Sequence, residues 1–472
     1  MPFFSETRLF FVQTGNGFWN PTPEPPRKRP LTPGAFHFID IAMKPLLCLC
    51  KSAGNGLKGL FLGLLGLAAC KNSPEPEPAL VGQADASRYV AIGASVTAGM
   101  MNGGLYRAGQ LAAYPNLLAR QLALVSGRQE FNQPLFAETE ENGTGYQVLT
   151  SLSPLRYEAV TANLALRSQN PRLYTKFTGD NQNLGVPSLR VADVNVPGYG
   201  SATGNALFER LLPAGQEQKT YAQYVTESRP TFFTFWLGDA DLAEFVTSGG
   251  TRPLTEPGLF STNVNLLFDA LARQGAKGVV ANLPDPTLLP LLMRPGELAA
   301  FRKDAFTPYW ITTGTGEVRT ATESDRILMS ADSIGFLTRA GFSKGFFKIA
   351  PLNNDDVLDV AEIEQVQQAL NAYNATLSAE ANARNWPLLD ANALFQKTDT
   401  GYLDFFGNRV ESDFFRDGQL LPNSIFSVDG VSLNPRGQAL MANEFIAVIN
   451  QAYQAQIPLL NLSQFEGPRL AR

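Results

Sequence analysis

The sequence predicts an α/β protein: a three-layer α/β/α sandwich on a mostly parallel sheet, with long insertions. One observation is a set of four short, almost continuously apolar runs, each of the length of a buried strand. Another is that helical patterns precede or follow these runs, and helices that cover both faces of a sheet go with strands buried on both faces. The third is size: 472 residues, 44% apolar and 17% charged, allow one large core or two ordinary ones.

The predicted strands are residues 88–93, 231–237, 278–283 and 387–390. In sheets of this kind, functional residues lie beyond the carboxyl ends of the strands. Several polar residues follow such ends directly, namely Ser95, Asp239 and Asp390. We therefore expect the site at this edge of the sheet.

Three helices are predicted, at about residues 263–273, 360–384 and 435–453. Gly275 is positioned to end the first helix, and Asp359 and Glu362 have the spacing of a capping box before the second. The third starts with Pro435 near its first turn and carries an apolar stripe. The amphipathic patterns indicate helices that pack against the sheet.

Two stretches, about 100–190 and 287–358, are long for connections and are predicted as insertions. The second is rich in aromatic residues: Phe301, Phe306, Tyr309, Trp310, Phe336, Phe342, Phe346 and Phe347. These side chains fit a lid or a substrate-binding wall over the site. They fit equally well a satellite core that packs the insertion itself.

The front of the chain has the pattern of a targeting segment. Residues 43–69 combine Lys44, Lys51 and Lys58 with an apolar run too short to span a bilayer. The end of this stretch, Leu67-Ala68-Ala69-Cys70, resembles the lipobox of bacterial lipoprotein signal peptides, which implies lipidation of Cys70. The alternative is a short buried helix that ends in a core cysteine.

This interpretation divides the chain into five parts. Residues 1–42 fit no targeting pattern, and we interpret them as an extension ahead of a true start at Met43. The signal peptide at 43–69 is followed by a lipidated, Pro-rich spacer at 70–87, a domain at 88–458 and a C-terminal tail at 459–472. The expected location is the cell envelope, with a lipid anchor in the outer membrane.

Charge and residue counts exclude several function classes. Residues 70–472 hold 31 Lys and Arg against 40 Asp and Glu, so a basic surface for nucleic acid is not expected. Cys48 and Cys50 are too few ligands for a closed zinc site, and no metal or cofactor is predicted. The chain has one histidine, His37, so residues 70–472 contain none.

Four segments carry a family resemblance. They are Gly93-Ala94-Ser95-Val96-Thr97-Ala98-Gly99, Val196-Pro197-Gly198, Gly238-Asp239-Ala240-Asp241, and the stretch from Asp429 through Ser432 to Gly437. In order and approximate spacing they resemble the blocks of the SGNH/GDSL hydrolases, and the first is similar to Gly-Asn-Ser-Leu-Thr-Ala-Gly of many Bacteroidetes members. The resemblance covers about residues 88–458 and implies a flavodoxin-like topology and esterase activity on carboxylic esters.

The family's catalytic roles map unevenly onto this chain. The resemblance implies Ser95 as nucleophile, Gly198 as a backbone donor to the oxyanion and Asp429 as the acid of the triad. The oxyanion asparagine falls on Ala240, and the catalytic histidine falls on Ser432. A serine hydroxyl needs a positioned base near neutral pH. Because residues 70–472 contain no histidine, this chain cannot use the standard Ser-His-Asp mechanism.

Each of these residues also has a purely structural interpretation. Ser95 can keep the strand–helix junction tight, and Asp429 can cap the last helix or hold a loop. Asp239 and Asp241, like the Asn353-Asn354-Asp355-Asp356 stretch, are more typical of a turn or a helix start than of a cation site.

Two functions compete. The chain can be a pseudoenzyme that uses an inherited cleft to bind an ester-bearing lipid, glycan, peptide or small molecule, or to dock a partner. It can instead be an esterase with a non-standard base, such as Asp429 acting directly or through Ser432. A structural envelope module without a ligand is a variant of the first function, because fold alone does not determine function.

Overall fold

The computed structural model describes residues 81–127, 131–152, 155–303, 308–329, 334, 338–416 and 419–471. The chain divides into two units, Met1–Ser73 and Pro74–Arg472, and all the described residues belong to the second. The predicted start at Met43, the signal peptide, Cys70 and most of the spacer lie outside the described residues. Within the described part, no helix is both long and apolar enough to cross a membrane.

The central sheet is parallel and contains the four predicted strands. Its order is β1 (Tyr89–Gly93), β6 (Phe232–Trp236), β7 (Lys277–Ala281) and β13 (Leu388–Leu389). The short segment 182–186 runs parallel to the free edge of β1, with the Ala91 amide donating to the Gln182 carbonyl at 2.8 Å. All residues of β1 and β6 are buried, which confirms strands covered on both faces.

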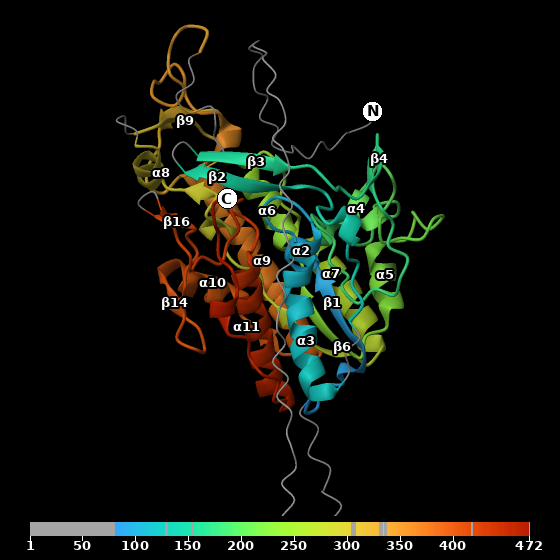
Figure 1. Ribbon diagram of the computed structural model, residues 1–472. Helices are drawn as coiled ribbons and strands as arrows, with labels where there is room; N and C mark the ends of the chain where they lie inside the picture. The colour runs from blue at the N-terminus through green and yellow to red at the C-terminus, as the bar shows by residue number, and fades with distance from the viewer. Residues whose placement is uncertain are drawn as a thin grey trace, which may run out of the picture. The chain divides into compact units, whose positions relative to one another are not determined.

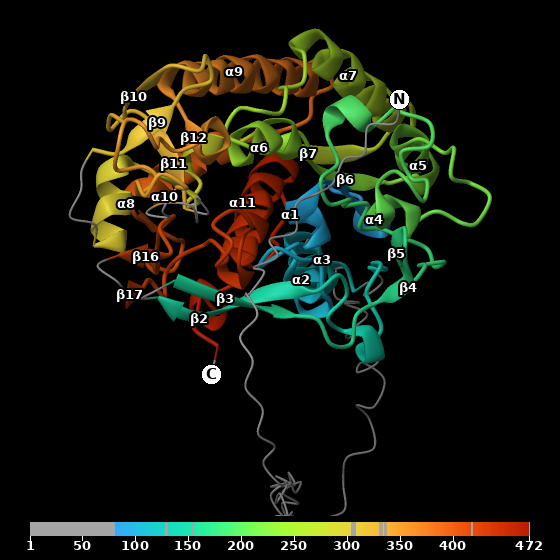
Figure 2. The same cartoon turned by 90° about the horizontal axis from the view of Figure 1, so that it is seen from above.

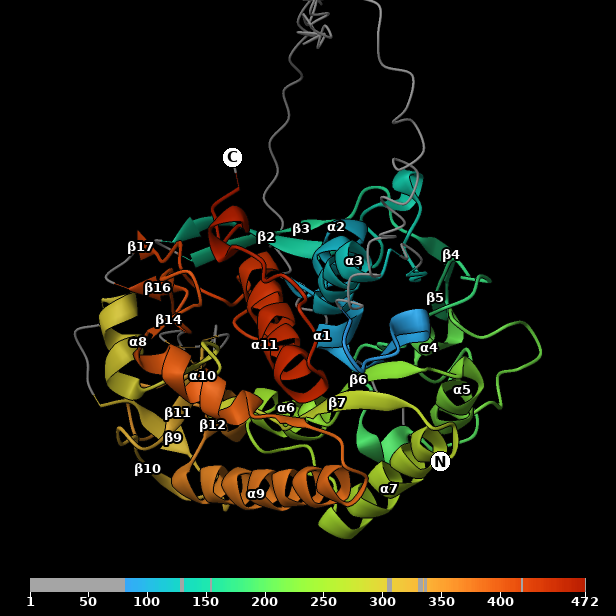
Figure 3. The ribbon, with the colours of Figure 1, turned by 90° about the horizontal axis from the view of Figure 1, so that it is seen from below.

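Helices cover both faces of this sheet, so the three-layer prediction is confirmed. Figure 3 shows α3 (Tyr114–Ser126) and α11 (Pro435–Tyr453) on one side of β6 and β7, with α7 (Pro257–Arg273) and α9 (Val360–Ala383) on the other. The helix α5 (Tyr221–Ser228) packs beside α7. The main core is formed where these helices meet the sheet.

The predicted helix starts follow from their capping residues. The Asp359 side chain accepts a hydrogen bond from the Glu362 amide, and the Glu362 side chain accepts one from the Asp359 amide, so the capping box of α9 is confirmed. Helix α11 begins at Pro435 behind an Asn434 cap. Helix α7 begins at Pro257, ahead of the predicted start near residue 263, because proline is well suited to a first helical turn.

The stretch 100–190 is only partly an insertion. It contains α2 (Arg107–Ala112) and α3, and α3 is one of the helices that cover the sheet, packed against α11. Two antiparallel hairpins complete the stretch: β2 (Tyr146–Leu152) with β3 (Leu155–Val160), and β4 (Leu166–Gln169) with β5 (Arg172–Tyr174).

The stretch 287–358 packs on a small core of its own. Its elements are β8 (Leu292–Met293), α8 (Pro295–Arg302), β9 (Trp310–Thr312), β10 (Val318–Thr320), β11 (Arg326–Leu328) and β12 (Val357–Leu358). Tyr309 is fully buried in this core, and Phe301 and Phe346 pack against it. The satellite-core interpretation therefore holds for these residues, whereas Phe306 and Phe336 lie outside the described residues. Figure 2 shows this insertion at the side of the sheet domain.

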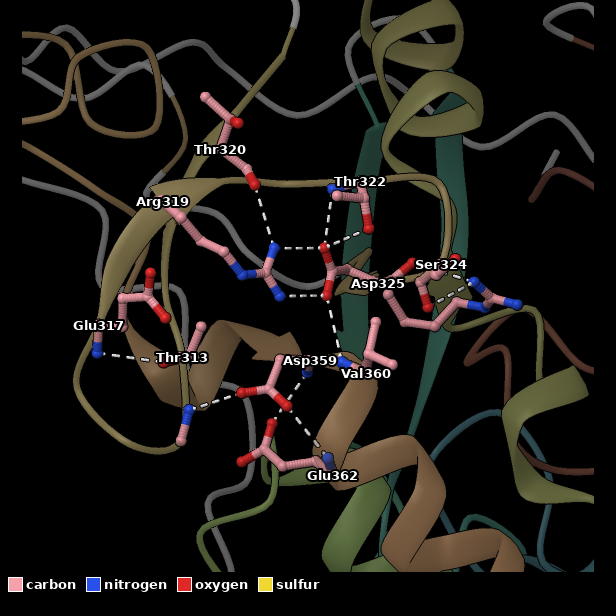
Figure 4. A network of polar contacts seen from close by, with 12 residues as sticks. Thr313, Glu317, Arg319, Thr320, Thr322, Ser324, Asp325, Asp359, Val360 and Glu362 are labelled. Carbon is pink, nitrogen blue, oxygen red and sulfur yellow. Dashed lines mark hydrogen bonds and ion pairs between the residues drawn. The ribbon is translucent and has the colours of Figure 1, made fainter.

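A polar network fastens this insertion to the start of α9 (Figure 4). The Asp325 carboxylate accepts two hydrogen bonds from the Arg319 guanidinium, both at 2.7 Å, and others from Thr322 and the Val360 amide. Burial acts to raise the pKa of Asp325, but the hydrogen bonds from Arg319 and Thr322 outweigh it and leave that pKa below its usual value. Burial raises the pKa of the nearby Glu362 to about 7.

The remaining elements surround this frame. They are α1 (Ser95–Ala98), α4 (Ala206–Glu209), α6 (Asp239–Thr247), α10 (Ala391–Thr400), β14 (Tyr402–Leu403), β15 (Arg409–Val410), β16 (Phe415–Arg416) and β17 (Gln419–Leu420). The predicted C-terminal tail packs onto the domain, because Leu462 is buried and the Ala471 amide donates to the Leu149 carbonyl.

Candidate active site

The predicted nucleophile lies on a sharp turn between β1 and α1. The strand ends at Gly93, and Ser95 is the first residue of α1. A side chain at position 93 would place its Cβ 2.0 Å from the Thr97 hydroxyl oxygen and 2.5 Å from the Trp236 carbonyl oxygen. Only glycine allows the turn to pack this closely against β6, which accounts for the glycine two residues before Ser95.

The Ser95 hydroxyl meets a donor and not a base. Its oxygen accepts a hydrogen bond from the Ser188 backbone amide at 3.1 Å. Within the described part of the chain, the Ser95 hydroxyl donates no hydrogen bond, and neither Asp429 nor Ser432 bonds to it. The environment is suited to holding an oxygen that carries negative charge, but it does not remove the proton.

The backbone donor beside Ser95 belongs to Ser188, whereas the sequence analysis placed this role at Gly198. Ser188 has a φ of +60°, the left-handed conformation that glycine adopts more readily. Gly198 lies ten residues further along in a turn next to exposed Val196, and the nearest atoms to a Cβ there would belong to Gln218. The sequence offered a signal, because Val186-Pro187-Ser188 repeats the Val-Pro-x pattern of 196–198.

A buried carboxylate holds the loop that follows Ser188. Asp241 accepts hydrogen bonds from the Val191 amide at 2.7 Å, the Ala192 amide at 3.3 Å and the Thr255 hydroxyl at 2.6 Å. Burial raises the pKa of Asp241 to about 7, even though these hydrogen bonds act in the opposite direction. Asp241 therefore positions the Ser188 loop relative to α6.

The end of β6 carries an acid next to position 240, where the resemblance implies an amide. Ala240 is buried and has no polar group to give to an oxyanion. Its neighbour Asp239 has one carboxylate oxygen buried without a hydrogen-bond partner among the described residues. Burial raises the pKa of Asp239 to about 6, so this carboxyl group can change its protonation state near neutral pH.

Asp429 holds a loop, as its structural interpretation proposed. One oxygen of its carboxylate accepts from the Val431 amide at 2.9 Å and the Ser432 amide at 2.8 Å. The other oxygen accepts from the Gly103 amide at 2.7 Å. Ser432 is buried in this loop, so the two residues that match the Asp and His positions are adjacent to each other.

Gln438 joins the last helix to the nucleophile turn. Its side-chain oxygen accepts from the Tyr114 amide at 2.8 Å, and its side-chain nitrogen donates to the Val96 carbonyl at 3.1 Å. The buried Gln438 thus connects α11, α3 and α1 at the site. Sequence reasoning missed this residue, because a glutamine inside a helix gives no signal of its own.

A largely apolar cavity of about 70 Å³ lies beside the turn that carries Ser95 between β1 and α1. Its wall is formed by Val96, Trp236, Asp239, Leu242, Ala243, Pro284, Asp285, Pro286, Leu288, Leu289, Phe395, Phe426, Val431 and Leu433. Three of the matched segments therefore meet at one cavity, at the edge where α1, α6 and α11 lie together in Figure 2. Its acidic wall residues are Asp239 and Asp285.

The described residues include no group of three or more His, Cys, Asp or Glu side chains arranged to hold a metal ion. Asn354–Asp356 form a short helical turn before β12, and the Asn354 side chain donates to the Gly249 carbonyl at 3.4 Å. This agrees with the interpretation of that stretch as a loop before a helix.

Comparison with known protein families finds a match for this chain. The family model described as GDSL-like Lipase/Acylhydrolase matches residues 89–445. No curated protein matches the chain. The matched range extends from the first residue of β1 into α11 and so includes each element that contributes to the site.

Proposed function

This chain belongs to the GDSL-like lipase/acylhydrolase family, and we propose that it is a cell-envelope lipoprotein that binds an acyl ester without efficient hydrolysis. The observation that carries the proposal is the environment of the Ser95 hydroxyl, which accepts a hydrogen bond from the Ser188 amide and bonds to no basic group among the described residues. The histidine and asparagine positions hold Ser432 and Ala240. Loss of a triad nucleophile or base typically costs roughly 10⁴–10⁶ in turnover.

The cavity supports an acyl group as the part of the ligand that is bound. Its wall is mainly aliphatic and aromatic and begins at Val96, next to the residue that an ester carbonyl would approach. Burial of an acyl chain there is favourable by about 0.8 kcal/mol for each methylene group. The alcohol part of the ester, whether lipid, glycan or small molecule, would extend out of this cavity.

A second candidate function is an esterase with Asp239 as its base. Asp239 lines the same cavity as Val96, has one carboxylate oxygen without a partner in the described part of the chain, and has a pKa raised to about 6 by burial. A base with a pKa near the working pH is effective in general base catalysis. This candidate requires the Asp239 carboxylate to reach the Ser95 hydroxyl directly or through one water molecule.

We expect that a fluorophosphonate probe does not label the wild-type chain. We also expect that wild type hydrolyses short-chain esters no faster than the Ser95→Ala variant does. The physical reason is that Ser95 stays protonated and weakly nucleophilic. Mass spectrometry of the probe adduct and a chromogenic ester assay measure the two outcomes. Probe labelling of Ser95, with turnover abolished by Ser95→Ala, would contradict the pseudoenzyme proposal.

The same assay separates the two candidates. If wild-type turnover is present, Asp239→Asn removes the proposed base while keeping the side-chain shape, and loss of turnover would support the esterase. Asp390→Asn is the matched control, because Asp390 also follows a strand end but caps α10 through the Ala393 amide.

The lipoprotein part of the proposal predicts acylation at one position. In a bacterial host grown with tritiated palmitate, the full chain should incorporate label, and Cys70→Ser should abolish it. Cys50→Ser is the control, because Cys50 lies ahead of the apolar run of the leader. Equal labelling of the Cys70→Ser chain would exclude this residue as the anchor.

A further inference from the structure

A loop of the insertion displays large apolar side chains to solvent. In residues 338–350, between β11 and β12, Phe342 is 36% exposed, Phe347 42% and Ile349 67%. The same insertion buries Tyr309 and Leu352 completely, so its core is already filled. The three exposed residues therefore form a surface feature, which we call the apolar loop tip.

Backbone hydrogen bonds hold the tip in place. The Thr338 amide donates to the Phe342 carbonyl at 2.8 Å, and the Gly345 amide donates to the Ala350 carbonyl at 2.7 Å. The Trp310 amide of β9 donates to the Gly345 carbonyl at 2.7 Å, which fixes the loop on the insertion. The Phe342 and Phe347 rings pack edge to face with their centroids 5.7 Å apart. The apolar side chains of the tip are therefore exposed by a loop whose backbone is held by hydrogen bonds.

Three basic residues lie in and next to the tip on an otherwise acidic chain. Residues 334–354 contain Arg339, Lys344 and Lys348 and no Asp or Glu, although the whole chain has a net charge of −5. Lys344 pairs with Asp356 at 3.6 Å, whereas none of the ion pairs among the described residues includes Arg339 or Lys348. The Lys348 ammonium lies 5.8 Å from the centre of the Trp310 ring. Two cations thus remain available to an anionic partner.

Aromatic and aliphatic side chains flanked by lysine and arginine are typical of segments that enter the interface of a membrane. The apolar groups enter the headgroup region, and the cations are attracted to anionic lipids. Figure 1 shows β9 and the gold-to-orange loop beyond it at the upper end of the domain, the end at which β3 and α6 also lie. If this loop contacts a membrane, the end of the domain that carries β3 and α6 faces the lipid.

A second exposed apolar group has one basic residue, Arg409, beside the acidic Asp404 and Glu411. Leu403, Phe405 and Phe406 lie on the hairpin of β14 and β15, where Asp404 accepts hydrogen bonds from the Phe406 and Asn408 amides. Figure 1 places β14 toward the lower part of the domain, away from β9. This hairpin provides a matched control of similar apolar exposure.

We propose that the apolar loop tip, together with Arg339 and Lys348, is a docking surface for anionic lipid membranes. The surface acts in addition to the proposed lipid anchor and does not depend on it. The proposal rests on three exposed apolar side chains, two cations that form no ion pair with a described residue, and a hydrogen-bonded backbone, all within one short loop.

The test uses residues 71–472, which include the whole second unit, so that neither an acyl anchor nor the apolar leader contributes. Co-sedimentation with vesicles of equal parts phosphatidylglycerol and phosphatidylethanolamine is compared with sedimentation on neutral phosphatidylcholine. We expect preferential binding to the anionic vesicles, about tenfold weaker binding for the Phe342→Ser/Phe347→Ser/Ile349→Ser variant, and weaker binding at high salt. The Arg339→Gln/Lys348→Gln variant, which leaves the apolar side chains unchanged, should lose the preference for anionic lipid.

The Leu403→Ser/Phe405→Ser/Phe406→Ser variant should bind as tightly as the parent chain. Equal vesicle binding by the parent and by both loop variants would overturn the proposal, and so would loss of binding in the hairpin variant alone. Gel filtration adds a further outcome. A dimer that the loop-tip variant converts to a monomer would assign the surface to a second copy of the chain and overturn lipid docking.

Discussion

The double variant Ser432→His/Ala240→Asn is expected to hydrolyse short-chain esters at least about 10³-fold faster than the parent chain. A histidine at position 432 supplies a base for the Ser95 proton, and an asparagine at 240 supplies a side-chain donor to the oxyanion. Taken separately, a base contributes roughly 10⁴–10⁶ and one oxyanion donor about 10²–10³, and these effects do not add fully. Initial rates on p-nitrophenyl acetate and butyrate measure the gain.

The structure supports this expectation at three points and limits it at one. Ser95 begins α1 on the tight Gly93 turn, the Ser188 amide already faces its hydroxyl, and Val431 and Leu433 bring the loop of Ser432 to the cavity beside it. The limit is Asp429, whose carboxylate already accepts three backbone amides. An imidazole at position 432 would have to share that carboxylate to be oriented by it.

Three further variants serve as controls for the gain. Ser432→His alone should recover most of the activity, Ala240→Asn alone should recover almost none, and Ser95→Ala on the double variant should abolish it. A double variant that folds as stably as the parent and remains inactive would show that the cleft has diverged beyond positions 240 and 432.

Local sequence patterns were sufficient for the sheet and for three of its covering helices, α7, α9 and α11, although α7 begins earlier than predicted. A fully buried parallel strand is apolar along its length, so β1, β6 and β7 stand out without any knowledge of their neighbours. The capping box of Asp359 and Glu362 marks the start of α9, because its hydrogen bonds form within four residues. The helix α3 was missed because its stretch was expected to be an insertion, although Pro115 in its first turn is a helix-start signal.

The candidate site was less predictable, because its partners are set by tertiary contacts. The amide at Ser95 comes from a serine with positive φ, and a pattern search favours glycine at such a position. The role of Asp429 depends on Gly103, more than 300 residues away in sequence, and that of Gln438 depends on Tyr114 and Val96. The raised pKa of Asp239 results from burial, which the sequence alone does not reveal.

Arg319→Met is expected to lower the free energy of unfolding by about 3 kcal/mol, because it leaves the Asp325 carboxylate buried without its cation. The Asp325 side chain has no exposed surface, and its two bonds to Arg319 join β10 to the loop before β11 (Figure 4). Because the pKa of folded Asp325 is below its usual value, its contribution is present above pH about 4 and is lost at lower pH. The difference between wild type and variant should therefore narrow as the pH falls below about 4, as measured by urea unfolding.

Arg469→Met is the matched control for this change. Arg469 also contacts a carboxylate, that of Glu466 at 2.9 Å, but both side chains are mostly exposed, so its removal should cost no more than about 1 kcal/mol. Comparing the loss of stability in the two variants shows whether an ion pair stabilises the insertion because its carboxylate is buried or merely because it is an ion pair. Since Asp325 also accepts the Val360 amide at the start of α9, hydrogen exchange in Arg319→Met should increase first in the first turn of α9 and in β10. Equal destabilisation by the two variants, or exchange that rises uniformly over the domain, would contradict a local fastening role for the Asp325 network.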